Sequence, residues 1–148
     1  MFKIDVVDYN NKDFINLCQL LENEHKQVIK EQRSPNGNCL NNLENFKYVY
    51  LAFMDDKAVG CLAMKDIRDG VAELGRLYVL SDYRNHGVAT KLFDICSEQA
   101  KKDGAKKLIL DTYQRFEAAI KLYKKLGFEE INNYIDSSIY SICMEKKI

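Results

Sequence analysis

The sequence predicts an α/β (α+β) fold, in which helices pack against a mixed β-sheet whose strands are mostly antiparallel. Two observations lead to this prediction. Strand-like runs and stretches with helical periodicity follow one another in the order βα, long loop, βββ, α, β, α, ββ. The three consecutive strand-like runs are joined by short polar turns, which is typical of an antiparallel meander, whereas later strands are separated by helices.

The first elements are a strand and a helix. Residues 2–7 alternate apolar and polar side chains, which predicts a strand, and Asp13 introduces a helical pattern that continues to Val28. Residues 33–45 contain the only proline of the chain and are predicted to form a long irregular surface loop. Loops of this length often carry substrate contacts.

Three strands and a second helix follow. The strands are predicted at residues 48–54, 58–65 and 71–80, because these runs are rich in β-prone residues and are separated by turn residues. Residues 88–103 then place apolar side chains at helical spacing, which predicts a helix that ends at Gly104.

The last part of the chain supplies a strand, a helix and a final strand or two. The strand at 108–110 is expected to be buried on both faces, and the helix spans residues 115–126. Gly127 stands where a C-cap glycine belongs. The final strands are expected at 134–135 and 139–144. Because no repeat or linker divides the chain, one domain is expected.

The charge balance argues against a nucleic-acid partner. The chain has 22 basic and 22 acidic residues among 148, so no global field of either sign would attract nucleic acid or an anionic membrane. No apolar stretch approaches the length of a bilayer, and residues 1–5 lack the layout of a signal peptide. We therefore expect a cytoplasmic protein without nucleic-acid or membrane partners.

The cysteines and histidines do not form a metal-binding pattern. The five cysteines are an odd number, widely scattered and without a Cys-x-x-Cys pair, and His25 and His86 are the only histidines. We therefore expect no metal site, and reduced thiols that are mostly buried. The cysteines are Cys18, Cys39, Cys61, Cys96 and Cys143.

A glycine-containing turn, residues 84–90, lies between a predicted strand and a predicted helix and is a candidate anion-binding site. The first N–H groups of a helix have no intrahelical partner and the macrodipole is positive there, so helix N-termini bind phosphates. Gly87 lets the backbone approach a ligand, Ala89 keeps the approach uncrowded, and Arg84 adds a cation. The alternative is a surface turn that needs glycine only for its dihedral angles.

Three blocks of the sequence resemble the GNAT superfamily of N-acetyltransferases. They are residues 72–79 (AELGRLYV), 83–92 (YRNHGVATKL) and 118–128 (AAIKLYKKLGF), and they follow one another in the family's order. The resemblance implies a GNAT-like sheet of six to seven strands with about four helices and a splayed central strand pair. It implies a single acetyltransferase domain over residues 1–148.

The resemblance also implies acetyl-CoA (coenzyme A) as the cofactor and acyl donor. The strands at 72–80 and 106–112 are expected to splay around the pantetheine arm, which would pair with backbone groups of residues 77–79. The N–H groups of residues 85–90 are expected to wrap the pyrophosphate. The cofactor-binding residues implied in this way are Leu77, Tyr78, Val79, Arg84, Asn85, His86, Gly87, Val88, Ala89 and Thr90.

Two residues are candidates for catalysis by the same resemblance. Tyr123 matches the family tyrosine whose hydroxyl reaches the CoA sulfur and can protonate the departing thiolate. The alternative is that Tyr123 only packs beside Phe116 and Ile120. Glu73 matches a strand position that supplies a carboxylate near the amine, where burial would raise its pKa and favour proton acceptance. The alternative is an ion pair with a nearby Lys or Arg.

Further positions complete the expected site. The backbone N–H of Val79 or Leu80, left free by a bulge, is expected to stabilise the oxyanion. Asp111 ends a predicted strand and is a candidate second polar contact in the cleft. His86 lies in the phosphate turn, so we interpret it as a phosphate-side or solvent residue. Phe116 replaces an asparagine with which many family members contact the cofactor, so it has no expected polar role.

The sequence therefore predicts an acetyl-CoA-dependent N-acetyltransferase. It would move an acetyl group to an amine of a small molecule or peptide by direct attack in a ternary complex. The alternative is a non-catalytic acyl-CoA-binding or sensor module that has lost turnover; the presence of Glu73 and Tyr123 favours the enzyme. Since dimers are common in the family, a homodimer is an alternative to a monomer.

Overall fold

The computed structural model describes residues 1–29, 37–132 and 141–148. Its strands are β1 (Phe2–Val7), β2 (Phe46–Met54), β3 (Lys57–Lys65), β4 (Val71–Val79), β5 (Lys107–Tyr113), β6 (Glu129–Ile131) and β7 (Ser141–Lys147). Its helices are α1 (Lys12–Val28), α2 (Val88–Lys102) and α3 (Glu117–Lys125), with short 3-10 helices η1 (Leu43–Asn45) and η2 (Ser81–Tyr83).

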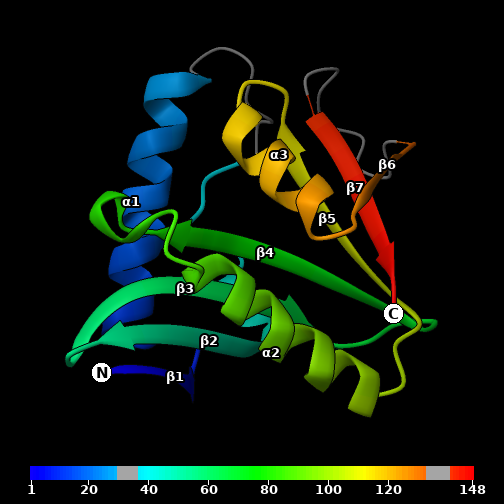
Figure 1. The fold of residues 1–148 in the computed structure, drawn as a ribbon, viewed down its shortest axis with the longest axis horizontal. Helices are drawn as coiled ribbons and strands as arrows, with labels where there is room; N and C mark the ends of the chain where they lie inside the picture. Colours follow the sequence, from blue (N-terminus) through cyan, green and yellow to red (C-terminus); the bar gives the residue numbers. More distant parts are fainter. Residues whose placement is uncertain (30–36, 133–140) are drawn as a thin grey trace.

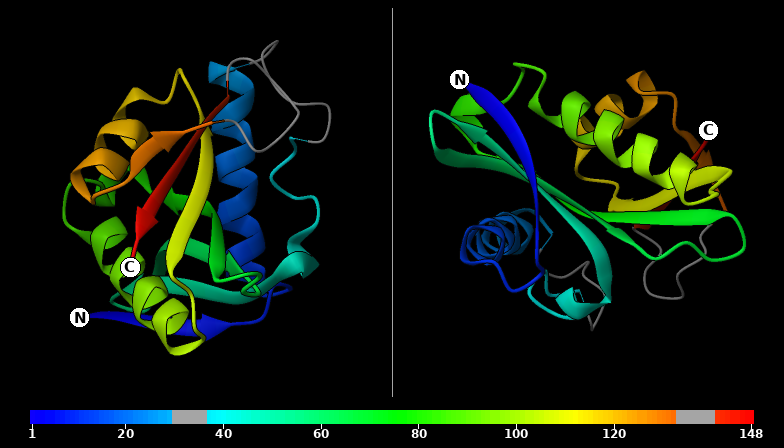
Figure 2. Two further views of the ribbon diagram at one scale, coloured as in Figure 1. Left: turned by 90° about the vertical axis from the view of Figure 1, so that its right-hand side faces the viewer. Right: turned by 90° about the horizontal axis from the view of Figure 1, so that it is seen from below.

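The strands form one seven-stranded sheet in the order β1-β2-β3-β4-β5-β7-β6 (Figure 1). Neighbouring strands are antiparallel except for β4 and β5. Helix α1 covers one face of the sheet, and α2 and α3 lie on the other (Figure 2). The predicted mixed sheet is confirmed, although the described residues form three α-helices instead of about four.

Each face of the sheet has its own apolar core. On the α1 face, Phe14 and Leu17 of the helix pack in one cluster with Leu51 of β2. On the other face, Leu92 and Phe93 of α2 belong to a larger cluster that includes strand residues on both sides of the β4–β5 junction. The apolar stripes of the two helices therefore fix the sheet between them, because each stripe removes apolar surface from water.

One prediction for the last strands is wrong. Strand β5 is not buried on both faces: Leu108 and Leu110 are buried in the α2-side core, whereas Ile109 on the other face is only half-buried. The final strand begins at Ser141, and the strand predicted at residues 134–135 lies outside the described residues.

Strands β4 and β5 form the splayed central pair that was expected. Their parallel pairing is limited to Val71–Glu73 on β4 and Lys107–Ile109 on β5. Beyond these residues β4 continues beside β3 and β5 continues beside β7, so the two strands diverge (Figure 1). The sheet is therefore open at its middle, next to the N-terminal end of α2.

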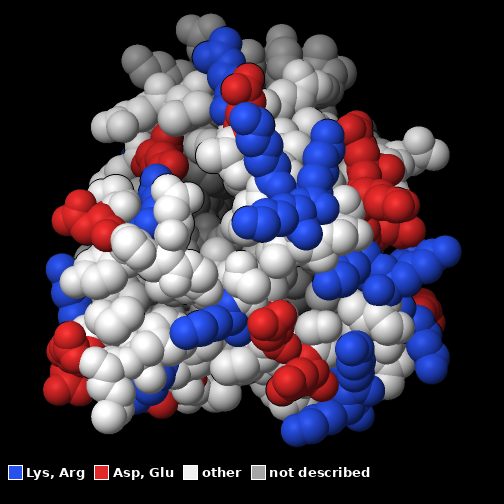
Figure 3. Space-filling view, viewed as in Figure 1, with Lys and Arg blue, Asp and Glu red and all other residues white. Residues whose placement is uncertain are grey.

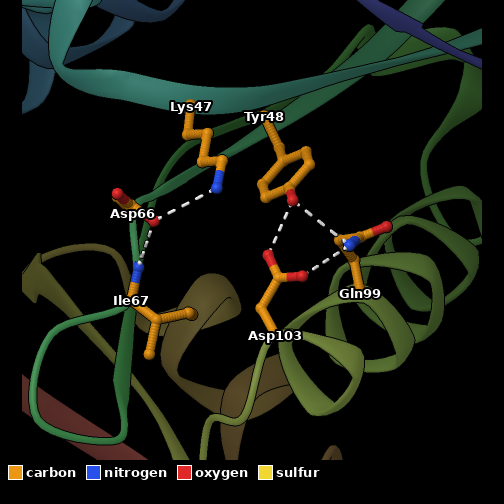
Figure 4. Close-up of polar contacts among 6 residues, drawn as sticks. All are labelled: Lys47, Tyr48, Asp66, Ile67, Gln99 and Asp103. Carbon is orange, nitrogen blue, oxygen red and sulfur yellow. Dashed lines mark hydrogen bonds and ion pairs between the residues drawn. The ribbon is translucent and has the colours of Figure 1, made fainter.

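A polar network holds the opposite end of α2 against the sheet (Figure 4). The Tyr48 hydroxyl on β2 donates to a carboxylate oxygen of Asp103 at 2.6 Å. The Gln99 amide of α2 donates to the Tyr48 hydroxyl at 3.2 Å and to the other Asp103 oxygen at 3.0 Å. The hydrogen bond from the Tyr48 hydroxyl has the largest effect on the pKa of Asp103 and lowers it. Burial raises this pKa and the hydrogen bond from Gln99 lowers it, so that the net result is a pKa below the ordinary value.

We expect Tyr48→Phe to lower the melting temperature by a few degrees at neutral pH. Because the pKa of Asp103 is depressed in the folded state, the carboxylate stabilises the fold above its unfolded pKa, and this contribution disappears as pH falls through the folded value. The difference between parent and variant should therefore shrink in acid. Thermal unfolding at both pH values measures it, with Tyr9→Phe at an exposed position as the control. Equal losses at both pH values would contradict the assignment.

Candidate active site

A cleft of about 280 Å³ opens where β4 and β5 diverge. Its walls include Leu77 of β4, Asp111 of β5, Phe93 of α2, Tyr123 of α3 and His25 near the end of α1. The space-filling view shows this face hollowed in the region between α1, β4 and α3 (Figure 3). The two strands are hydrogen-bonded at one end only, and their divergence creates this cleft in the middle of the sheet.

The glycine turn leads from the end of β4, through η2, into α2. Asn85 and Gly87 have φ values of 65° and 83°, in the left-handed region. Gly87 is the N-cap residue of α2, and no side chain caps the helix there. A Cβ atom added at Gly87 would have nothing within 4 Å, so the turn is open above this residue. The first N–H groups of α2 are therefore available to an anionic ligand.

Arg84 connects the turn to the rest of the structure. Its Nε donates to the Val79 carbonyl at 2.7 Å, and its terminal nitrogen forms an ion pair with Glu24 of α1 at 3.1 Å. The guanidinium also lies over the Tyr78 ring, 5.3 Å from its centroid. Arg84 therefore fixes the turn against β4 and α1, and its role as a phosphate cation stays a prediction. His86 is exposed, and its place beside a phosphate stays a prediction.

The bulge on β4 lies earlier than the sequence suggested. The Leu80 N–H donates to the Val59 carbonyl at 2.9 Å, so the prediction of a free Leu80 donor is wrong. The register instead shifts opposite Cys61 to Ala63, where Arg76 has a φ of 60°. Two hydrogen bonds support this conformation. The Arg76 side chain donates to the carbonyls of Cys39 and Asn41, which lie in the segment before η1, each at 2.9 Å.

The ladder beside this bulge directs the Val79 N–H away from β3. Hydrogen-bonded and non-hydrogen-bonded pairs alternate in an antiparallel ladder. Leu80 is hydrogen-bonded to Val59 of β3, so the preceding pair, Val79–Gly60, is a non-hydrogen-bonded pair. The backbone N–H of Val79 therefore faces the side from which β5 has departed. Leu77 shares this direction, whereas the backbone of Tyr78 faces Cys61 of β3.

Tyr123 lies in the wall of the cleft on α3, with 7% of its surface exposed. Its ring makes edge contacts with Phe93 and Phe128, at centroid distances of 5.9 and 6.1 Å. Phe116, which was expected to pack beside Tyr123, lies elsewhere. It precedes the first turn of α3, and its ring centroid is 4.9 Å from that of His25.

The hydroxyl of Tyr123 forms no hydrogen bond with any residue in the part of the chain that the structure describes. Burial, and secondly the negative charge of Asp111, raise the pKa of Tyr123 well above its usual range. The phenol therefore stays protonated, and a buried hydroxyl without a partner is costly unless a ligand supplies one. Its position in the cleft wall makes it available as a proton donor.

Glu73 forms an ion pair with Lys65 of the neighbouring strand, at 2.8 Å, and its side chain is 31% exposed. The alternative interpretation, pairing with a nearby cation, is therefore what the structure shows, and the expected burial against apolar neighbours is wrong. The reason is the register: Met64 pairs with Leu74, which brings the next residue of β3 opposite Glu73.

Asp111 is the carboxylate that lines the cleft. Burial raises its pKa most, the charge of Glu73 raises it further, and Arg76 and Lys65 act in the opposite direction. Asp111 is exposed to solvent at the cleft that it lines, while the protein around it raises its pKa. A carboxylate with a raised pKa accepts a proton more readily than one with the ordinary value.

Several cleft residues were not predicted. Tyr113 lies two residues after Asp111 on β5 and therefore on the same face of the sheet, and this spacing could have predicted it as a cleft residue. Phe93 lies on the apolar face of α2, where periodicity indicates only burial. His25 and Cys39 approach each other at 3.5 Å between Nδ1 and Sγ, and nothing in their sequence positions indicates this contact.

All five cysteines are buried thiols outside any disulfide, as predicted. The described residues contain no group of three or more potential metal ligands. None of the helices in residues 1–29, 37–132 and 141–148 is long and apolar enough to cross a bilayer.

Cys96→Ala and Cys143→Ala are expected to retain most of the acetyltransferase activity that the sequence predicts. Burial raises the pKa of Cys96 far above neutrality, so its thiol is not a nucleophile, and Cys143 is 1% exposed on β7. Activity assays together with mass spectrometry of the protein after incubation with acetyl-CoA provide the test. Trapping of an acetyl group on either cysteine would contradict this expectation.

Residues 12–128 match the acetyltransferase (GNAT) family, and the chain belongs to that family. It is 27% identical over 141 residues to N-alpha-acetyltransferase 30 of Schizosaccharomyces pombe, covering 84% of this chain and 83% of that protein.

Solved structures show the same fold. An acyl-CoA N-acyltransferase from Klebsiella pneumoniae superposes with a TM-score of 0.82 at 23% identity, covering 99% of this chain and 97% of that one. PaiA N-acetyltransferase of Thermoplasma acidophilum, in complex with coenzyme A, superposes with a TM-score of 0.76 at 20% identity, covering 100% and 99%.

Proposed function

We propose that the chain is an acetyl-CoA-dependent N-acetyltransferase that acetylates an amine of a small molecule or peptide. The observation that carries the proposal is the Tyr123 hydroxyl, which is buried in the wall of a cleft between splayed strands and has no hydrogen-bond partner among the described residues. Membership of the GNAT family supports it. A single sheet includes both β1 and β7, which supports one domain over residues 1–148.

The donor acetyl-CoA fits the cleft and the turn together. The open N-terminus of α2 around Gly87 is suited to the pyrophosphate, because unpaired N–H groups and the helix dipole both favour negative charge. The backbone groups of Leu77 and Val79 that face the opened gap are suited to the amide groups of the pantetheine arm. Coenzyme A in the Thermoplasma acidophilum structure supports this choice of ligand.

The proposed reaction is direct attack by the amine nitrogen on the thioester carbonyl. The Val79 N–H, which faces the gap, donates to the developing oxyanion. When the carbon–sulfur bond breaks, Tyr123 gives its proton to the thiolate. The carboxylates of Glu73 and Asp111 are the candidates for the proton acceptor on the amine side. Cys96 and Cys143 are buried and do not line the cleft, so neither of these thiols is placed to form an acyl-enzyme.

Release of free CoA thiol across a panel of acceptors tests the proposed function. The panel should contain amino acids, polyamines, aminoglycosides and peptides with free N-termini; the relative named N-alpha-acetyltransferase 30 is the reason to include the last class. We expect thiol release that depends on at least one acceptor. Tight binding of CoA without release on any acceptor would support the alternative, a non-catalytic acyl-CoA-binding module.

A further inference from the structure

We propose that Asp111, and not Glu73, receives the ammonium group of the acceptor and takes its proton. The inference rests on the proposed function, because it assigns a role within the same site. It starts from the place of the two carboxylates relative to the opening of the sheet.

Asp111 is the carboxylate that lies beyond the point where β4 and β5 separate. In the parallel ladder Glu73 pairs with Ile109, and this is the last pair of the two strands. Side chains alternate along a strand, so Asp111 lies on the same face as Ile109, while Leu110 enters the α2-side core on the other. Glu73 is thus at the closed end of the gap, and Asp111 lines the cleft.

Asp111 and Tyr123 reach the cleft from opposite faces of the sheet. Tyr123 comes from α3 and packs with Phe93 on the α2 side. Asp111 shares the α1 face with Tyr113, whose ring meets that of His25 on α1 at 5.9 Å. A thioester held in the gap would therefore have its proton donor on one side and the Asp111 carboxylate, which an incoming amine would meet, on the other.

The two carboxylates also differ in charge compensation. Glu73 is bound to Lys65 at 2.8 Å, whereas Asp111 forms no ion pair among the described residues. Its negative charge is therefore available to a cationic acceptor, and burial and Glu73 raise its pKa toward the range useful for a base. The titratable and charged groups around it on the packed elements are Lys65, Glu73, Arg76, His25, Cys39, Cys143, Tyr113 and Tyr123.

The proton balance of the step is complete without a further reactant. The acceptor ammonium gives one proton to the Asp111 carboxylate, and the neutral nitrogen then forms the bond to the acetyl carbon. As the carbon–sulfur bond breaks, the thiolate takes the Tyr123 proton, and the nitrogen loses a second proton, which restores the phenol. Asp111 releases its proton to solvent, so each turnover yields one amide, one thiol and one proton.

Asp111→Asn tests the assignment, with Glu145→Gln as a control that breaks an ion pair to Lys107 outside the cleft. We expect kcat/KM for the acceptor to fall roughly 100- to 10,000-fold, with CoA affinity retained by calorimetry. The acid limb of the pH profile, which reports deprotonation of the base, should disappear. If the parent enzyme turns over and Asp111→Asn matches it, this inference is wrong while the proposed function stands; if the parent acetylates no amine, the proposed function itself fails.

Glu73→Gln separates the two carboxylates. Because the charge of Glu73 raises the pKa of Asp111, its removal should shift the acid limb to lower pH and leave the plateau rate largely intact. Titration of the Asp111 carboxyl carbon by NMR in the free protein gives a second readout: we expect a pKa above that of an ordinary aspartate, and a lower one in Glu73→Gln. A large fall of the plateau rate in Glu73→Gln, with an unchanged Asp111 titration, would make Glu73 the base.

Discussion

Gly87→Asp is expected to reduce the affinity for coenzyme A by roughly 100-fold or more, because like charges brought together at a binding site cost several kcal/mol. The new carboxylate would project from the N-cap of α2, where the proposed pyrophosphate site lies. It would also occupy the open space above the turn and place a side chain at a φ of 83°. Isothermal titration calorimetry with coenzyme A measures the change.

Gly104→Asp is the matched control for this variant. Gly104 follows the other end of the same helix, has a φ of 90°, and also has nothing within 4 Å of an added Cβ atom. The two variants therefore share backbone strain and added charge, and differ in the end of α2 that they alter. We expect Gly104→Asp to bind coenzyme A like the parent. Equal affinities in the folded Gly87→Asp variant and the parent would place the phosphate site elsewhere.

Tyr123→Phe is expected to lower kcat by roughly 100- to 10,000-fold, the usual cost of losing one positioned acid. The ring contacts with Phe93 and Phe128 remain, and the lost hydroxyl has no partner in the described residues, so the free energy of unfolding should change little. Affinity for acetyl-CoA should be almost preserved, since the predicted loss is in the chemical step. Steady-state kinetics, calorimetry and thermal unfolding of one preparation test all three.

Tyr50→Phe provides the comparison for Tyr123→Phe. Tyr50 is 2% exposed and its pKa is also raised by burial, but it lies in the core on β2 and does not line the cleft. We expect Tyr50→Phe to turn over at the parental rate. If Tyr123→Phe did so as well, Tyr123 would be a packing residue, and water or the acceptor would have to protonate the leaving thiolate.

The sequence predicts the elements of this fold well because their signals are local. The helical stripe of α2 and the C-cap glycines Gly104 and Gly127, with φ values of 90° and 99°, are properties of neighbouring residues. The glycine turn at residues 84–90 is of the same kind, because its position between a strand and a helix is visible along the chain.

The parts of the site that depend on pairing between distant segments could not be predicted in the same way. The ion pair of Glu73 with Lys65 follows from the β3–β4 register, which neither strand specifies alone. The residue with a left-handed φ at the bulge is Arg76 and not the neighbouring Gly75, and a left-handed non-glycine residue is uncommon. Asp111 was noticed as a polar strand end, but its separation from Glu73 at the opening of the gap needed the three-dimensional structure.

The measurement that tests the account most directly follows a labelled acetyl group from acetyl-CoA in the presence of the acceptor panel. The proposed function predicts that the label appears on the amine nitrogen of an acceptor, in an amount equal to the CoA released, with none on the protein. Label that stays on CoA with every acceptor, while coenzyme A binds tightly, would contradict it and leave a binding module. Label recovered on a cysteine would contradict direct transfer.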